Sequence, residues 1–169
     1  MKIVILLTPL LYSSLLLSQT EKNEVLGDYD GNGKKEYAYT KINDCNDECD
    51  GKCETIIYFS DKNIKPLAIA PSRNGTLFNL KDLNNDGKDE LGFYPDWCTS
   101  CWHPFYVYTL NKKKNWEPLL SPISTHCTQW DDGKIPIKKD PKKKGYVIIT
   151  TSLWKDEDIK VISKSIKIK

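Results

Sequence analysis

Histidine is scarce in this sequence: of its 169 residues, only His103 and His126 carry an imidazole. A Ser-His-Asp hydrolase needs a histidine as general base beside a serine held on a sharp strand-to-helix turn. The segment Ser124-Thr125-His126 lacks that nucleophile pattern. We therefore assign no catalytic residue and predict that the chain is not an enzyme.

A large net charge of either sign is also missing, since the formal net charge is only +2. Proteins that bind nucleic acid through its phosphates carry a clear excess of basic residues, so we expect no nucleic-acid partner. Two lysine-rich runs, 111–115 and 138–145, are interpreted as solvated loops between strands, with an anion-binding patch as the alternative.

Long apolar runs are absent except at the start of the chain. Residues 3–17 are mostly Ile, Val and Leu, but Pro9 interrupts a run that is already shorter than the about 20 residues of a membrane span. With Lys2 before it and Ser18-Gln19 after it, this run has the three-part layout of a signal peptide. We expect residues 1–18 to be that signal peptide.

The remaining residues, 19–169, have the length of one domain. Cleavage of a signal peptide predicts a secreted or periplasmic protein with no transmembrane segment in its mature chain. A protein or a glycan is the expected partner, and these patterns do not identify it.

Helical periodicity is rare, whereas short segments alternating with period two are common. The fold class that we predict is all-β, with antiparallel sheets in a propeller-blade-like or sandwich-like arrangement. The expected strands are 36–42, 55–60, 67–70, 76–80, 91–94, 105–110, 145–151 and 159–168. A shift in the apolar phase between Val161-Ile162 and Ile166-Ile168 predicts a bulge or break in the last strand.

One acidic pattern, D-x-[DN]-x-[DN]-G-x-x-E, occurs twice at an offset of 54 residues, at Asp28–Glu36 and Asp82–Glu90. Each copy leads directly into an expected strand, which indicates a structural repeat. Calcium takes six to eight oxygen ligands, and alternate residues of a tight loop can converge on one ion. Positions 1, 3, 5 and 9 would supply side-chain oxygens, and position 7 would supply a backbone carbonyl. The predicted metal ligands are Asp28, Asp30, Asn32, Lys34 and Glu36 in the first loop and Asp82, Asn84, Asp86, Lys88 and Glu90 in the second.

Neither loop is an EF-hand, because Tyr39 and Phe93 stand at position 12, where an EF-hand has a bidentate Glu. The second loop is interpreted as the better site, since the first has Asn32 where the second has Asp86. The alternative is a pair of Asx-rich turns that hold no metal.

The two loops resemble those of FG-GAP and VCBS-type repeats, the calcium-loop blades of integrin-alpha-like propellers. The resemblance covers only the two loops and their strands, and Glu stands at position 9 where that family more often has Asp. It implies calcium as the cofactor, bound through the residues of positions 1, 3, 5 and 9. A complete propeller needs at least four blades, so this chain resembles a fragment of one or a compact domain that reuses the loop.

Six cysteines follow the expected signal peptide: Cys45, Cys49, Cys53, Cys98, Cys101 and Cys127. In an exported protein an even number predicts three disulfides, with fifteen possible connectivities. We expect a local bridge within the run 45–53, and we expect Cys127 to pair with Cys98 or Cys101. An oxidising compartment argues against zinc bound by these thiols, with or without a histidine.

Two alternative functions remain open. Cys98-Thr99-Ser100-Cys101 has the C-x-x-C spacing of thiol-disulfide redox proteins, although an expected strand follows it instead of the helix that lowers a thiol pKa. The second alternative is a carbohydrate-binding module with aromatic rings as its platform, and core packing is the competing role for those rings. The candidate rings are Trp97, Trp102, Tyr106 and Trp130.

Overall fold

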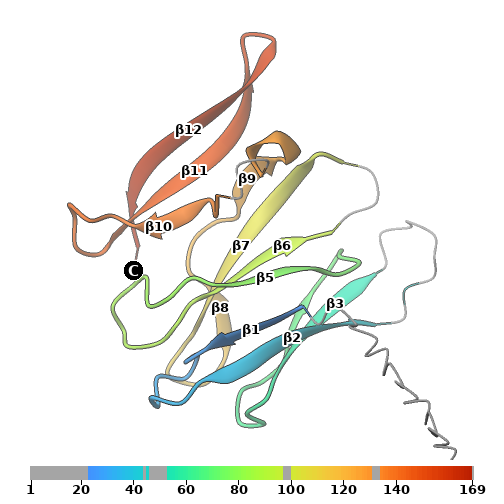
Figure 1. Ribbon diagram of the computed structural model, residues 1–169, viewed down its shortest axis with the longest axis vertical. Helices are drawn as coiled ribbons and strands as arrows, with labels where there is room; N and C mark the ends of the chain where they lie inside the picture. The colour runs from blue at the N-terminus through green and yellow to red at the C-terminus, as the bar shows by residue number, and fades with distance from the viewer. Residues whose placement is uncertain (1–22, 44, 46–52, 97–99, 131–133, 169) are drawn as a thin grey trace, which may run out of the picture.

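Three antiparallel sheets, stacked one after another, form the part of the chain that the computed structural model describes, residues 23–43, 45, 53–96, 100–130 and 134–168 (Figure 1). The first sheet has the strand order β1-β2-β3-β4. Its strands are β1 (Glu24–Gly27), β2 (Glu36–Asn43), β3 (Glu54–Phe59) and β4 (Leu67–Ile69). The expected signal peptide lies outside the described residues.

The second sheet repeats this meander with the order β5-β6-β7-β8, and β9 pairs with the start of β7. Its strands are β5 (Gly75–Asn79), β6 (Leu91–Pro95), β7 (Trp102–Leu110), β8 (Trp116–Pro118) and β9 (Ile123–His126). One turn of 3-10 helix, Cys127–Gln129, follows β9. The third sheet contains β10 (Ile137–Lys139), β11 (Tyr146–Lys155) and β12 (Asp158–Lys167).

The second sheet is covered on both faces, because alternate residues of its strands point to opposite sides. On one side Leu77, Leu91 and Phe93 join a core with Ile57 and Phe59 of the first sheet. On the other side Phe105 and Val107 join a second core with residues of the third sheet. From the third sheet these are Ile137, Val147 and Ile149. The result is a three-layer, sandwich-like stack.

Gly92 shows how tightly the second core packs. A Cβ atom added at this position would lie 2.8 Å from Cζ of Phe105 and 3.1 Å from a methyl carbon of Leu80. Because real Cβ contacts are longer, glycine at this position lets the tip of the Phe105 ring approach β6 this closely. The aromatic residue and the glycine are therefore a matched pair across β6 and β7.

The predicted all-β class is confirmed, and the eight expected strands all form. Four short strands were not predicted, namely β1, β8, β9 and β10, because three or four residues are too few to show a period. The predicted bulge in the last strand is wrong. All ten residues of β12 pair in register with β11, and its apolar phase shift leaves Val161 and Ile162 exposed on opposite faces of a projecting hairpin (Figure 1).

Replacing Phe93 with alanine tests the first core. This ring is fully buried, so Phe93→Ala should lower the free energy of unfolding by about 3–5 kcal/mol. Ile162 is 43% exposed, and Ile162→Ala should cost less than about 1 kcal/mol. Urea denaturation followed by tryptophan fluorescence measures both values. Equal losses for the two variants would contradict the assignment of Phe93 to the core.

Candidate metal centre

The two acidic loops have the same hydrogen-bonded conformation. In each, the two carboxylate oxygens of the Asp at position 1 accept the backbone N–H groups of positions 5 and 6. The distances are 3.0 Å from Asn32 to Asp28, 2.9 Å from Gly33 to Asp28, 3.1 Å from Asp86 to Asp82 and 3.1 Å from Gly87 to Asp82. The glycines at position 6 have φ of 84° and 88°, the left-handed region that glycine adopts without strain. The 54-residue repeat is therefore also a structural repeat.

The glutamate at position 9 closes each loop onto the core. Oε2 of Glu36 accepts the N–H of Tyr29 at 3.0 Å, and Oε2 of Glu90 accepts the N–H of Leu83 at 2.5 Å. The donor at position 2 carries a buried side chain in both loops: Tyr29 belongs to the first core and Leu83 to the second. Both carboxylates are buried as well, with 4% of Glu36 and 0% of Glu90 exposed.

Positions 3, 5 and 7 contribute shorter-range bonds. The side chain at position 3 accepts the N–H of position 5, and the side chain at position 5 accepts the N–H of position 7. The acceptors at position 3 are Asp30 and Asn84, those at position 5 are Asn32 and Asp86, and the donors at position 7 are Lys34 and Lys88. A carbonyl ligand from position 7 stays a prediction.

The two loops lie against each other at one edge of the stack. The N–H of Asp89 donates to the carbonyl of Asp28 at 2.8 Å, and the N–H of Asp28 donates to Oδ2 of Asp89 at 3.1 Å. A Cβ atom on Gly31 would lie only 3.0 Å from the carbonyl oxygen of Gly87. The contacts between the two loops therefore join the first sheet to the second.

Oxygen atoms converge in the first loop. One carboxylate oxygen each from Asp28, Asp30 and Glu36 lies within 4.8 Å of the others. Burial raises the pKa of Glu36, and the carboxylates of Asp30, Asp28 and Asp61 raise it further, against the lowering effect of the Tyr29 N–H. Sequence reasoning did not include Asp61. The pairing of Ala38 with Phe59 places it opposite Glu36 when the register is continued by two residues.

The second loop has different partners at the same places. Continuing the pairing of Leu91 with Tyr108 places Thr109 opposite Glu90, and the Thr109 hydroxyl donates to Oε1 of Glu90 at 3.1 Å. Nζ of Lys88 lies 3.4 Å from Oδ2 of Asp86 and donates to the carbonyl of Leu110 at 2.6 Å. Within the described residues, the carboxylates of this loop are not part of a convergent acidic group.

The cation contacts differ between the two loops. The second loop already has an ammonium group next to its position-5 carboxylate. In the first loop, Nζ of Lys114 lies 3.9 Å from Oδ2 of Asp30, and the Lys114 side chain is half-exposed. Surface pairs at this distance contribute little. The cation contact of the first loop is therefore longer, and its ammonium group more exposed, than the cation contact of the second loop.

Glu90 should make stability depend on pH. Burial raises its pKa to about 7, above the value near 4.5 of a solvated glutamate. Because the folded state favours the protonated form, the stabilisation is complete below about pH 4.5 and is lost as pH rises through about 7. In chelator, the free energy of unfolding should fall by about 3 kcal/mol across this window.

The isosteric variant Glu90→Gln isolates that contribution, because an amide imitates the protonated carboxyl at every pH. Its free energy of unfolding should vary less with pH than that of the unmodified protein, leaving mainly the smaller contribution of Glu36. Urea denaturation at a series of pH values measures the slope. An unchanged slope in Glu90→Gln would show that another group is responsible.

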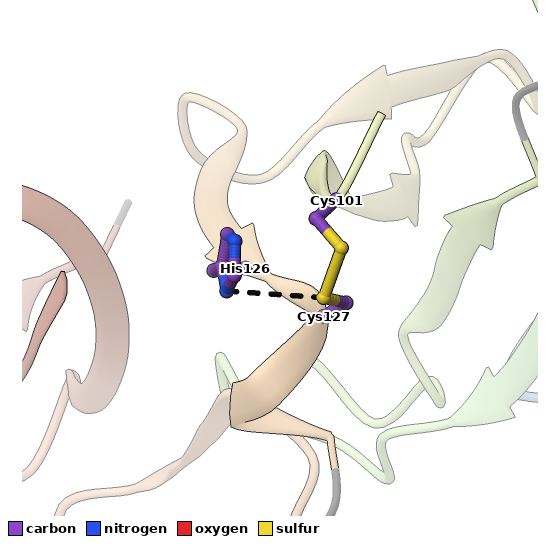
Figure 2. A group of neighbouring side chains, drawn as sticks. All are labelled: Cys101, His126 and Cys127. Carbon is purple, nitrogen blue, oxygen red and sulfur yellow. Dashed lines mark hydrogen bonds between the residues drawn. A yellow bond between two sulfur atoms is a disulfide. The ribbon is translucent and has the colours of Figure 1, made fainter. Parts of the chain in front are cut away.

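The disulfides confirm two pairing predictions. Cys45 is bonded to Cys53, which is the local bridge expected in the run 45–53. Cys101 is bonded to Cys127 across 26 residues, which is the long-range bridge expected for Cys127 (Figure 2). Cys49 and Cys98 lie outside the described residues.

The bond from Cys101 to Cys127 includes one cysteine of the C-x-x-C motif. Cys101 has no thiol while this bond is present, and β7 begins at the next residue instead of a helix. His126 lies beside the bridge, with Nδ1 3.9 Å from Sγ of Cys127 (Figure 2). The three side chains are close enough to hold a metal, but the sulfurs bonded to each other are not thiolate ligands.

The remaining candidate side chains have structural contacts. The ring nitrogens of His103 lie against the carbonyls of Pro95 and Ser100, and Nδ1 of His126 lies 3.0 Å from Oγ1 of Thr128. Trp130 packs into the second core, where it contacts the rings of Phe78, Tyr94 and Phe105. Trp102 lies edge-on to His126, Tyr106 packs at the border of the first core, and Trp97 lies outside the described residues. The rings named from the sequence therefore form no shared platform among the described residues.

Removing the long-range disulfide should cost more than removing the local one. In the loop-entropy model, Cys101→Ser/Cys127→Ser should lose about 3–4 kcal/mol, and Cys45→Ser/Cys53→Ser about 2–3 kcal/mol. Denaturation of both double variants under non-reducing conditions provides the comparison. A long-range variant as stable as the unmodified protein would show that this bridge does not support the native fold.

No family model matches this chain, and comparison with curated proteins and with solved structures found no match. In the described part of the chain, no helix is long and apolar enough to cross a membrane.

Proposed function

We propose that this chain is an exported, non-catalytic binding module whose fold is stabilised by calcium at the first acidic loop. The observation that carries the proposal is the convergence of oxygens from Asp28, Asp30 and Glu36 within 4.8 Å. Calcium binds oxygen at about 2.3–2.6 Å, so two ligands of one ion lie at most about 5 Å apart. The three carboxylates meet this geometric requirement.

The chemistry of the donor set also fits calcium. Carboxylates are hard oxygen ligands, and three of them around one point repel each other until a cation reduces their charge. Asp61 adds a fourth negative charge near Glu36. A bound ion would join the start of the loop, through Asp28 and Asp30, to the first residue of β2, through Glu36. Such a link would stabilise the loop that connects β1 to β2.

The arrangement of the sheets supports the FG-GAP and VCBS-type resemblance. In both four-stranded meanders the acidic loop lies between the first and second strands, β1 and β2 or β5 and β6. The second copy has Thr109 where the first has Asp61, and it has the ammonium of Lys88 beside Asp86. We propose that the second loop is a metal-independent copy of the first.

Export and a non-catalytic role are part of the same proposal. Disulfides persist in oxidising compartments, and two are present among the described residues. Cys101 is held in a disulfide, and both histidines contact neighbouring main-chain or hydroxyl oxygens. These contacts favour structural roles for the side chains that the redox and hydrolytic alternatives require.

Thermal unfolding with calcium and with chelator tests the site. At about a hundredfold excess over Kd, calcium should add about 2.7 kcal/mol to the free energy of unfolding and raise Tm by about 5–10 °C. Native mass spectrometry should show one bound ion. An absence of both effects would refute the proposal.

Asp28→Asn and Asp82→Asn form a matched pair, because each aspartate accepts the same two N–H groups in its own loop. Both variants should lose some stability in chelator. Only Asp28→Asn should also lose most of the increase in Tm that calcium produces. The opposite result would assign the ion to the second loop.

A further inference from the structure

Charge is unevenly distributed along the chain, although the total is nearly balanced. Residues 134–169 contain eleven lysines and four acidic residues, a formal net charge of +7. Residues 1–133 contain 14 basic and 19 acidic residues, a net charge of −5. The basic part includes the third sheet, whose long β11–β12 hairpin projects from the stack at the top of the view (Figure 1). Such an asymmetry points to an anionic partner.

One face of this sheet is turned away from the cores. Val147 and Ile149 of β11, with Ile166 of β12, pack on the second core, so the intervening residues point to the other side. We call this other side the Trp154 face. In order from the tip, it is formed by Trp154 and Ile159, Ser152 and Val161, Thr150 and Ser163, Ile148 with Lys138 and Ser165, and Tyr146 with Lys167. Ser152 is buried at this point, because its hydroxyl donates to Oε1 of Gln129 in the 3-10 turn at 2.6 Å.

The Trp154 face offers three kinds of contact along one line. Trp154 is 66% exposed, more than any other large hydrophobic side chain of the described residues, and Val161 is 50% exposed. Farther along, the hydroxyls of Thr150 and Ser163 lie 2.8 Å apart. Lys138 and Lys167 are exposed at the end away from the tip. At about 3.4 Å per residue, the distance from Trp154 to Tyr146 is about 27 Å, which suits an extended ligand.

A hollow next to the Trp154 face would contact a bound ligand on more than one side. It is bounded by Thr128 and Gln129 of the 3-10 turn, Ile135 before β10, and Ile148, Val161 and Ser163 of the Trp154 face. Ile135 is 41% exposed, so the rim of the hollow is apolar. Hydroxyl groups and aliphatic carbons thus line the same concave surface.

We propose that the Trp154 face binds an acidic polysaccharide. The flat apolar face of a sugar ring packs on an exposed indole, hydroxyls of the sugar bond to threonine and serine hydroxyls, and lysine ammonium groups attract carboxylates or sulfates. The hairpin turn next to Trp154 carries Asp156, Glu157 and Asp158, so the anionic groups of the ligand should lie at the Lys138 and Lys167 end and an uncharged ring face on the indole. This inference goes beyond the proposed calcium role and does not depend on it.

One carboxylate lies near the basic end of the Trp154 face. Oδ2 of Asp140 accepts the hydroxyl of Ser165 at 2.5 Å, and Lys143 beside it contributes to a lowered pKa of Asp140. Asp140 therefore already has a hydroxyl donor and a neighbouring lysine. For this reason it does not cancel the positive charges of Lys138 and Lys167 at this end.

Calorimetric titration of the full chain with oligogalacturonate at low salt tests the proposal, and the methyl-esterified oligomer of the same length is the uncharged control. Chelator is present throughout, so failure here is separate from failure of the calcium proposal. The acidic oligomer should bind at least tenfold more tightly than its ester. Added salt should weaken the interaction.

Variants locate the binding surface. Trp154→Ala and Lys138→Gln/Lys167→Gln should each weaken binding about tenfold. The matched control, Lys155→Gln/Lys164→Gln, removes the same charge from the opposite face of the same sheet and should change affinity less than twofold. All replaced side chains are exposed, and circular dichroism should show unchanged folding.

Three outcomes would overturn the proposal. The first is no measurable binding of oligogalacturonate at low salt. The second is equal weakening of binding by the two pairs of lysine substitutions. That result would indicate that the ligand responds to the overall positive charge and not to one face of the sheet. The third is tighter binding to duplex DNA or to phosphatidylglycerol vesicles than to the acidic oligomer, which would assign the charge to a different class of partner.

Discussion

The structure depends on a buried glutamate that accepts a backbone N–H from the second residue of its own loop. Glu36 bonds to Tyr29 in the first repeat, and Glu90 bonds to Leu83 in the second. Each bond joins the last residue of an acidic loop, at or just before the start of the next strand, to a residue whose side chain belongs to a core. Because a buried carboxylate without a hydrogen-bond partner is costly, the loop conformation and the packing of the core must form together.

The two repeats keep this bond but differ in how they balance its charge. In the second repeat Thr109 donates to Glu90, and Lys88 places an ammonium group beside Asp86. In the first repeat Asp61 takes the place of Thr109, and three carboxylate oxygens converge without a comparable internal cation. This difference is the reason that we propose a bound cation for the first copy and none for the second.

The third sheet serves a different purpose from the two repeats. Its inner residues Val147 and Ile149 complete the second core and thereby cover the far side of the second sheet. Its outer residues have no core to cover, and they include the most exposed large hydrophobic side chain described, Trp154. Stability and surface chemistry are thus assigned to alternate residues of the same strands.

The all-β class, eight of the strands and the repeated loop were predictable from the sequence, because they depend on local alternation and on spacing within nine residues. The short strands β1, β8, β9 and β10 were not, since their pairing partners, and not their own three or four residues, define them. The expected bulge in β12 failed for a related reason: exposure on both faces of a projecting hairpin removes the link between apolar phase and pairing.

By itself, the sequence determined which residues can bind a cation and which cysteines are available. Only the tertiary structure decided that Asp61 faces Glu36, that Thr109 faces Glu90 and that Cys101 pairs with Cys127. The sequence separations of these pairs are 25, 19 and 26 residues. Continued strand register brings all three pairs together, the third through the pairing of Trp102 with His126, and register is not encoded in a local pattern. The sequence placed the Asp82 loop first as a metal site, and our proposal places the Asp28 loop first because it rests on these tertiary contacts.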